Sequence, residues 1–195
     1  MMTTVEATSN SAAIRTHLSV KAPDRLYVIV DACQAFDLVN VARSKFKQPT
    51  RMLFKGAAAS VEEIESVAPF FIPVDLETDF LEHWSAFLGK SAGILFVSAA
   101  EPREIFRHLR QIFVVQDEKG QEHFFRFYDP RVLRIYLTTC TPEELTQFFG
   151  PMKRIVLEGA DPNTLITFDI ELGELKKSTR KLTGTANAGS GGNNA

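Results

Sequence analysis

Short apolar runs alternate with helix-like stretches through the first half of the sequence. Continuous runs at Leu26–Asp31, Phe70–Val74 and Gly93–Ser98 have the length and the β-branched content of buried strands. The stretch from 101 to 113 instead repeats its apolar residues at the spacing of one helical face. Because strands that alternate with helices are typical of parallel sheets, the sequence predicts an α/β fold with a mixed, mostly parallel sheet flanked by helices.

The pattern changes after residue 113. Val114–Val115 and His123–Tyr128 flank the turn-forming run Asp117–Gly120, which predicts a β-hairpin. A helix is expected from Pro130, and another from Thr141, where the run Thr-Pro-Glu-Glu has the spacing of a capping box. These features predict a small helical C-terminal lobe.

Composition and apolar content divide the chain into four parts. Residues 1–22 have few bulky apolar side chains and are expected to form a flexible segment. Residues 23–129 are the predicted α/β core, and 130–175 the helical lobe with a late strand pair. Residues 176–195 are dominated by small and polar residues, which predicts a disordered tail.

Charge and length exclude several classes of function. The 195 residues contain 22 Lys and Arg against 24 Asp and Glu, a balance that argues against a general nucleic-acid binder. No secretory signal or bilayer-spanning run is evident, so a cytoplasmic protein without a membrane partner is expected. Two cysteines cannot form a disulfide framework, and the four histidines lack metal-ligand spacing, so neither a metal nor another cofactor is expected.

The aromatic content is biased toward one residue type. There are 16 Phe against 3 Tyr and 1 Trp. Most of the phenylalanines lie between Phe70 and Phe149 and fall on predicted strand or helix faces. Core packing is the expected role of most of these rings, and only an exposed remainder would be available to a partner.

Asp31 and Cys33 follow the first predicted strand, where α/β enzymes often place working residues. A thiol or phosphoryl-transfer site is one interpretation, although no phosphate-binding glycine loop follows the strand. The favoured interpretation is that the Asp31 carboxylate caps the next helix.

The segment Phe124–Arg131 has the most closely specified sequence in the chain. A strand here would place Phe125 and Phe127 on one face, with Arg126 and Tyr128 on the other. Asp129 would then cap a helix that begins with Pro130. Arg126 and Arg131 can both reach Asp129 or Asp31, so we expect an arginine–carboxylate network of structural rather than catalytic character.

Arg103, Arg107 and Arg110 lie on one face of the predicted helix over 101–113. This spacing is typical of the solvated face of an amphipathic helix rather than of an anion site. Arg107 and Arg110, with Phe148 and Phe149 at the end of a later helix, are nevertheless the candidate partner-binding residues.

The run Phe-Arg-Phe-Tyr-Asp-Pro-Arg at Phe125–Arg131 resembles the signature of the type VI secretion effector-adaptor family, long catalogued as a domain of unknown function. Other parts agree in order: Leu26–Gln34 with Asp31, Leu53–Ser60 with Gly56, Val67–Asp75 with Pro69, and the end at Gly150. The family positions matched are Asp31, Gly56, Pro69, Arg126, Tyr128, Asp129, Pro130 and Arg131.

This resemblance implies a cytoplasmic, non-enzymatic adaptor or chaperone that binds a secreted toxin effector and loads it onto the VgrG spike protein. It implies no cofactor and no catalytic residue. Two other functions stay open, namely an α/β enzyme with a site at Asp31 and Cys33, and a plain protein-binding scaffold.

Overall fold

The computed structural model describes residues 4–54 and 64–182, and its central feature is a seven-stranded sheet in the order β2-β3-β1-β4-β7-β8-β9. Every neighbouring pair in this sheet is antiparallel. A separate two-stranded hairpin comprises β5 and β6. The strands are β1 (Arg25–Asp31), β2 (Arg51–Met52), β3 (Pro69–Val74), β4 (Gly93–Ser98), β5 (Val114–Gln116), β6 (Glu122–Phe124), β7 (Arg154–Glu158), β8 (Thr164–Glu171) and β9 (Glu174–Lys181).

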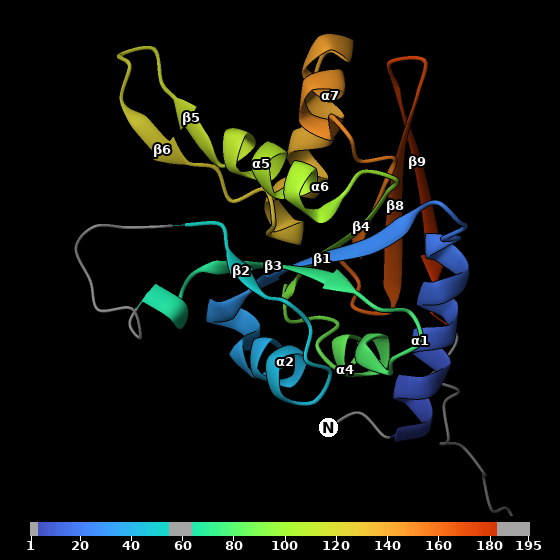
Figure 1. Ribbon diagram of the computed structural model, residues 1–195. Coiled ribbons are helices and arrows are strands. Elements are labelled where there is room, and N and C mark those ends of the chain that lie inside the picture. The colour runs from blue at the N-terminus through green and yellow to red at the C-terminus, as the bar shows by residue number, and fades with distance from the viewer. Residues whose placement is uncertain (1–3, 55–63, 183–195) are drawn as a thin grey trace, which may run out of the picture.

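Helices cover both faces of the sheet (Figure 1). One face packs against α1 (Thr4–Leu18), α2 (Ala32–Ser44) and α4 (Phe80–Ser85). The opposite face packs against α5 (Pro102–Phe113), α6 (Pro130–Thr139) and α7 (Pro142–Phe149). The sheet therefore separates two apolar cores, which we call the first core and the second core.

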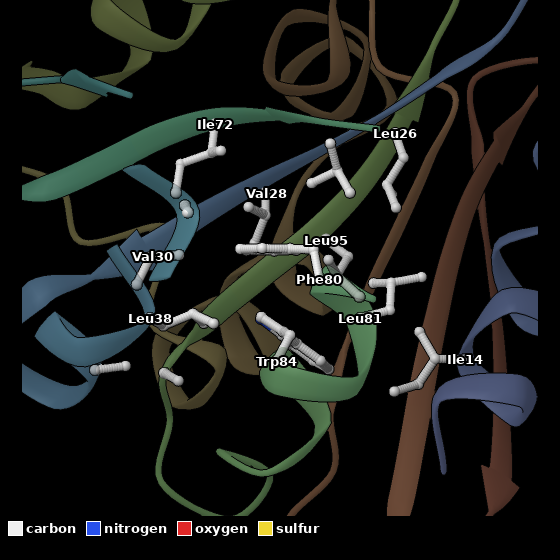
Figure 2. Close-up of a cluster of buried hydrophobic side chains, with 14 of the residues drawn as sticks. Ile14, Leu26, Val28, Val30, Leu38, Ile72, Phe80, Leu81, Trp84 and Leu95 are labelled. Atoms are coloured by element: carbon white, nitrogen blue, oxygen red, sulfur yellow. The ribbon is translucent and has the colours of Figure 1, made fainter. Parts of the chain in front are cut away.

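The alternation of side chains along β1 supplies both cores. Leu26, Val28 and Val30 point into the first core, which Figure 2 shows with Trp84 of α4 beneath them. Tyr27 and Ile29 point into the second core. Because both faces are covered, β1 is apolar at every position from Leu26 to Val30 and lacks the alternation of a half-exposed strand.

The prediction of a mostly parallel sheet is wrong. β1 pairs antiparallel with β3 on one side and with β4 on the other. β3 and β4, which are connected through α4, consequently run in the same direction, but β1 lies between them and they do not pair. The alternation of strands with helices that suggested a parallel sheet arises instead because helices cover both faces of an antiparallel sheet, which also explains the continuous apolar runs.

The predicted helical C-terminal lobe is also absent as a separate body. α6 and α7 pack in the second core, and β7 pairs with β4 and β8 inside the main sheet. The capping box predicted at Thr141 is confirmed, since its side chain accepts from the N–H of Glu144 while the Glu144 carboxylate accepts from the N–H of Thr141.

The chain ends differ from the sequence prediction where the structure describes them. Helix α1 occupies Thr4–Leu18, inside the segment expected to be flexible. Ile14 and Leu18 of this helix are buried in the first core. Strand β9 extends to Lys181, inside the segment expected to be a disordered tail, because it pairs with β8 along its whole length.

The phenylalanine bias is mainly a property of the two cores. Of the 16 phenylalanines, only Phe124 is exposed, at 57% of its surface. Tyr27 stacks between Phe71 and Phe96, at ring-centroid distances of 5.5 and 5.3 Å, across three adjacent strands. Such offset stacks add to the free energy gained by burying the rings.

We expect Gly93→Ala to destabilise the fold by at least about 3 kcal/mol, because strain and overlap coincide at this position. Gly93 has φ +146°, and an added Cβ would overlap the backbone carbonyl of Ile29 in β1. The matched control is Gly120→Ala in the hairpin turn, where φ is +76° but no atom lies within 4 Å. That control should cost only about 1 kcal/mol. Urea unfolding measures the free energy of unfolding of both variants. An equal decrease in the two would contradict the assigned β1–β4 register.

Candidate functional site

The signature segment Phe125–Arg131 forms a turn rather than the expected strand. β6 ends at Phe124, and the N–H of Asp129 donates to the carbonyl of Arg126 over 3.0 Å. Phe127 and Tyr128 are both buried as a result, although a strand would have placed them on opposite faces. The turn delivers Asp129 to the start of α6.

Asp129 is the N-cap of α6, as its position before Pro130 predicts. Its Oδ1 accepts from the backbone N–H of Arg131 over 2.9 Å. The Arg131 guanidinium donates to both carboxylate oxygens, with Nη2 to Oδ2 at 2.7 Å and Nε to Oδ1 at 2.9 Å. Asp129 is only 3% exposed, and this bidentate contact replaces hydrogen bonds that water would otherwise donate to the carboxylate.

Asp31 at the end of β1 is the second buried carboxylate, and it is 1% exposed. Its Oδ1 accepts from the backbone N–H of Cys33 over 3.1 Å, which caps α2 as predicted. Its Oδ2 lies 3.0 Å from Nη2 of Arg126. The same Nη2 lies 3.7 Å from Oδ2 of Asp129, so Arg126 bridges the two carboxylates.

The pKa values of the two carboxyls are shifted in opposite directions from the ordinary value of an aspartate. Burial raises the pKa of Asp31, and neither the Cys33 N–H nor Arg126 fully offsets this effect. Burial acts on Asp129 too, but the hydrogen bonds and charge of Arg131 outweigh it and lower the pKa of that carboxyl. Ionised Asp129 therefore stabilises the fold, whereas ionised Asp31 is tolerated because it caps α2 and faces Arg126.

Most of the other matched family positions lie around this network. Pro69 begins β3 directly opposite Asp31 in the sheet. The Arg126 guanidinium lies 5.8 Å from the centre of the Tyr128 ring, and burial raises the pKa of that tyrosine. Pro130 is buried at the first turn of α6. Gly56 lies outside the described residues.

A chain of aromatic rings joins the signature segment to the helices around it. The ring centroids of Tyr128 and Phe113 of α5 lie 6.3 Å apart, and those of Phe127 and Phe148 of α7 lie 5.9 Å apart. Phe125 lies 4.6 Å from Tyr136 of α6. The turn is thus held by rings on one side and by arginine–carboxylate contacts on the other.

Cys33 has the surroundings of an unreactive thiol. The residue as a whole is exposed. Partial burial of its sulfur, together with the Asp31 charge, nevertheless raises the pKa of the thiol. A raised pKa reduces the thiolate fraction, whereas nucleophilic cysteines have lowered values. The Asp31 carboxylate is meanwhile engaged with a helix N-terminus and with Arg126. These contacts support the structural interpretation of the pair.

An open cavity of about 610 Å³ lies beside the signature, between α5, the hairpin, α6 and α7. Its walls combine apolar and polar side chains, namely His108, Gln111, Ile112, Val114, Val115, Phe125, Tyr136, Glu144, Gln147 and Phe148. Burial, with the nearby Cys140 thiol, raises the pKa of Tyr136 to about 12, so its hydroxyl stays neutral. We call this the apolar cavity after the six aliphatic or aromatic members of its lining, although His108, Gln111, Glu144 and Gln147 make the rest of the wall polar.

The helices around the apolar cavity are fixed to one another. Nε2 of His108 in α5 donates to the carbonyl of Phe148 in α7 over 2.9 Å. Gly150 makes this contact possible, since it has φ +48° and a Cβ there would overlap the His108 ring. The cavity is consequently a preformed feature of the fold.

The four candidate partner-binding residues divide into two kinds. Arg107 and Arg110 are exposed on α5, as predicted. Phe148 and Phe149 are only 3% and 1% exposed, so their rings belong to the second core. Phe148 reaches a partner only through the part of its ring that lines the apolar cavity.

Sequence reasoning missed the apolar side chains that are exposed. Five of the seven exposed large hydrophobic residues among those described lie between 114 and 135, and they are Val114, Val115, Phe124, Val132 and Ile135. Ile135 is 68% exposed. Ile135 lies two positions from both Leu133 and Leu137, the buried leucines of α6, so helical spacing already places it on the other side of this helix. We call these five residues the exposed apolar group.

Two further features bear on function. Within 4–54 and 64–182, no helix is both long and apolar enough to span a bilayer. No three His, Cys, Asp or Glu side chains within the same ranges are grouped to hold a metal ion.

Comparison with known proteins gives one finding. The model of a family described as "Domain of unknown function (DUF4123)" matches residues 26–147. The match begins in β1, includes the signature and ends in α7. No curated protein and no solved structure matches the chain.

We expect Asp129→Asn to lower the free energy of unfolding by about 1 kcal/mol at neutral pH, since Asn still caps α6 but loses the charge that Arg131 binds. The pKa of Asp129 is lower in the folded state, so its contribution is present above the ordinary value of 3.8 and lost as pH falls through the folded value. Urea unfolding across pH checks this. A deficit that persists unchanged at the lowest pH would contradict it, and Arg131→Gln should show the same pH dependence.

Proposed function

This chain belongs to the DUF4123 family, and we propose that it is a non-enzymatic adaptor that binds a type VI secretion effector and loads it onto the VgrG spike. The family is associated with type VI secretion effector adaptors, and the match covers well over half of the chain. That association is the observation on which the proposal depends. The proposed site of action is the cytoplasm, before export.

The exposed apolar group provides a physical basis for effector binding. A chaperone must cover apolar surface of its client with apolar surface of its own. Val115, Phe124 and Ile135 are 42%, 57% and 68% exposed on the hairpin and α6, and Val115 also lines the apolar cavity. We propose that an apolar segment of the effector packs across this group and places a side chain in the cavity.

The arginine–carboxylate network has a different role in this proposal. Asp31, Asp129 and Arg126 satisfy one another and two helix N-termini, and they join β1, the signature turn and α6. A network of this kind fixes the position of the hairpin and α6. We propose that it holds the binding surface in place and performs no chemistry.

The proposal is tested by co-purification of this protein with the effector and VgrG proteins of the same secretion cluster. The adaptor should retain the effector and, in its presence, the spike. Retention of neither partner by the folded protein would overturn the proposal. Retention of the effector without any effect on spike assembly would instead favour a plain binding scaffold.

We expect Ile135→Asp to reduce effector retention about tenfold or more, because it places a charge in an apolar contact. Leu172→Asp is the matched control, since Leu172 is fully exposed on the β8–β9 turn, outside the exposed apolar group and the apolar cavity. Neither substitution should alter the unfolding midpoint strongly, because both side chains are exposed. Equal retention by the two variants would exclude α6 from the effector contact.

A further inference from the structure

A second depression, of about 400 Å³, lies against α5 and adjoins the apolar cavity at Gln111. Its walls are formed by Arg51, Arg103, Phe106, Arg107, Arg110 and Gln111, so four of its six residues are arginines. Arg51 comes from β2 at the edge of the main sheet, and the other residues come from α5. We call this group the arginine surface.

The arginine surface is held on a fixed support. Ile105, Leu109 and Phe113 anchor α5 in the second core. The Arg51 guanidinium lies 4.1 Å from the centre of the Phe106 ring, and Phe106 in turn lies 5.9 Å from Phe71 in β3. A planar guanidinium stacked in this way keeps its edge N–H groups free to donate. The cationic groups therefore surround an aromatic floor.

The charges of this surface are not used within the described part of the fold. Other arginines, such as Arg43, Arg126 and Arg154, contact carboxylates within 4 Å. None of the four arginines of the arginine surface has such a contact among residues 4–54 and 64–182. Two acidic residues lie at the start of α5. Glu101, the N-cap, pairs with Arg25, which leaves Glu104 as the one carboxylate within the helix against its three arginines.

We propose that the arginine surface is a docking site for an acidic segment of a protein partner. Arginine presents a fork of N–H donors that matches a carboxylate with two parallel hydrogen bonds. The spacing of Arg103, Arg107 and Arg110 along one helical face sets several such forks in a row. The segment that fits carries two or more Asp or Glu residues.

A protein segment fits this site better than a nucleic acid or a membrane. The whole chain has a net charge of −2, so the positive region is local. The surface is concave and small, and Gln111 lines both this depression and the apolar cavity. A polypeptide crossing α5 can therefore place carboxylates on one side and apolar side chains on the other. That the segment belongs to the effector or spike rests on the proposed function.

The docking site is tested first without either natural partner. The probe is a short fluorescent peptide of alternating Glu and Leu, with a Gln–Leu peptide of equal length as its neutral counterpart. The wild-type protein should bind the acidic peptide at least about tenfold more tightly, and added salt should weaken that binding. Equal binding of both peptides would overturn the proposal. Tighter binding of single-stranded DNA or of phosphatidylglycerol vesicles would overturn it too.

The double variant Arg107→Glu/Arg110→Glu should lower affinity for the acidic peptide by about tenfold or more. The control is Arg180→Glu/Lys181→Glu on β9, which makes the same change of charge at exposed positions far along the chain from α5. If both variants lose binding equally, the effect is one of net charge and the docking site is wrong. The milder Arg107→Gln/Arg110→Gln, checked by its unfolding curve, keeps the test valid if the first variant does not fold.

The natural partners then separate this inference from the proposed function. If the wild-type adaptor retains effector and spike, and the arginine variant retains both equally well at every salt concentration, the docking site is wrong while the adaptor function stands. If the wild type retains neither partner but binds the acidic peptide through Arg107 and Arg110, the adaptor function is wrong while the docking site stands.

Discussion

The burial of β1 on both faces is the constraint on which the rest of the structure depends. From Leu26 to Val30 the strand has no exposed surface, and it pairs on both edges. A strand in this position needs helices above and below it, and α2 with α4 and α5 with α6 provide them. It also ends in a carboxylate, Asp31, that lies away from water. Such a group must be given donors, so the N-terminus of α2 and the Arg126 side chain are both required there.

The arginine–carboxylate network extends this requirement across the chain. Asp31 and Arg126 are separated by 95 positions, yet their contact closes the space between β1 and the signature turn. Asp129 then fixes the start of α6 through Arg131. Raised and lowered pKa values within one network show that the site balances a cost at Asp31 against a gain at Asp129. The sequence signature of the family therefore encodes how the fold is joined.

Features set by residues close together in the sequence were predictable, and features set by contacts between distant segments were not. The hairpin at 114–124 and the caps at Asp31, Asp129 and Thr141 follow from residues close together in the sequence. Whether the strands run parallel or antiparallel depends on β3 and β4 pairing with opposite edges of β1, and no local sequence pattern predicts that pairing. The burial of Phe148 and the exposure of Phe124 likewise depend on tertiary packing, because residue type alone marks both side chains as apolar.

In the function that we propose, partner recognition uses side chains that lie outside this network. In that proposal one helix offers two chemistries, because Arg103, Arg107 and Arg110 of α5 contact no carboxylate among the described residues and the same helix lines the apolar cavity. The His108 contact to α7 and the aromatic packing of Phe113 hold that helix before any partner arrives. A preformed surface loses little conformational entropy on binding. Exposed residues there can also change without disturbing either core, so under the proposed function one fold would accommodate clients with different acidic and apolar segments.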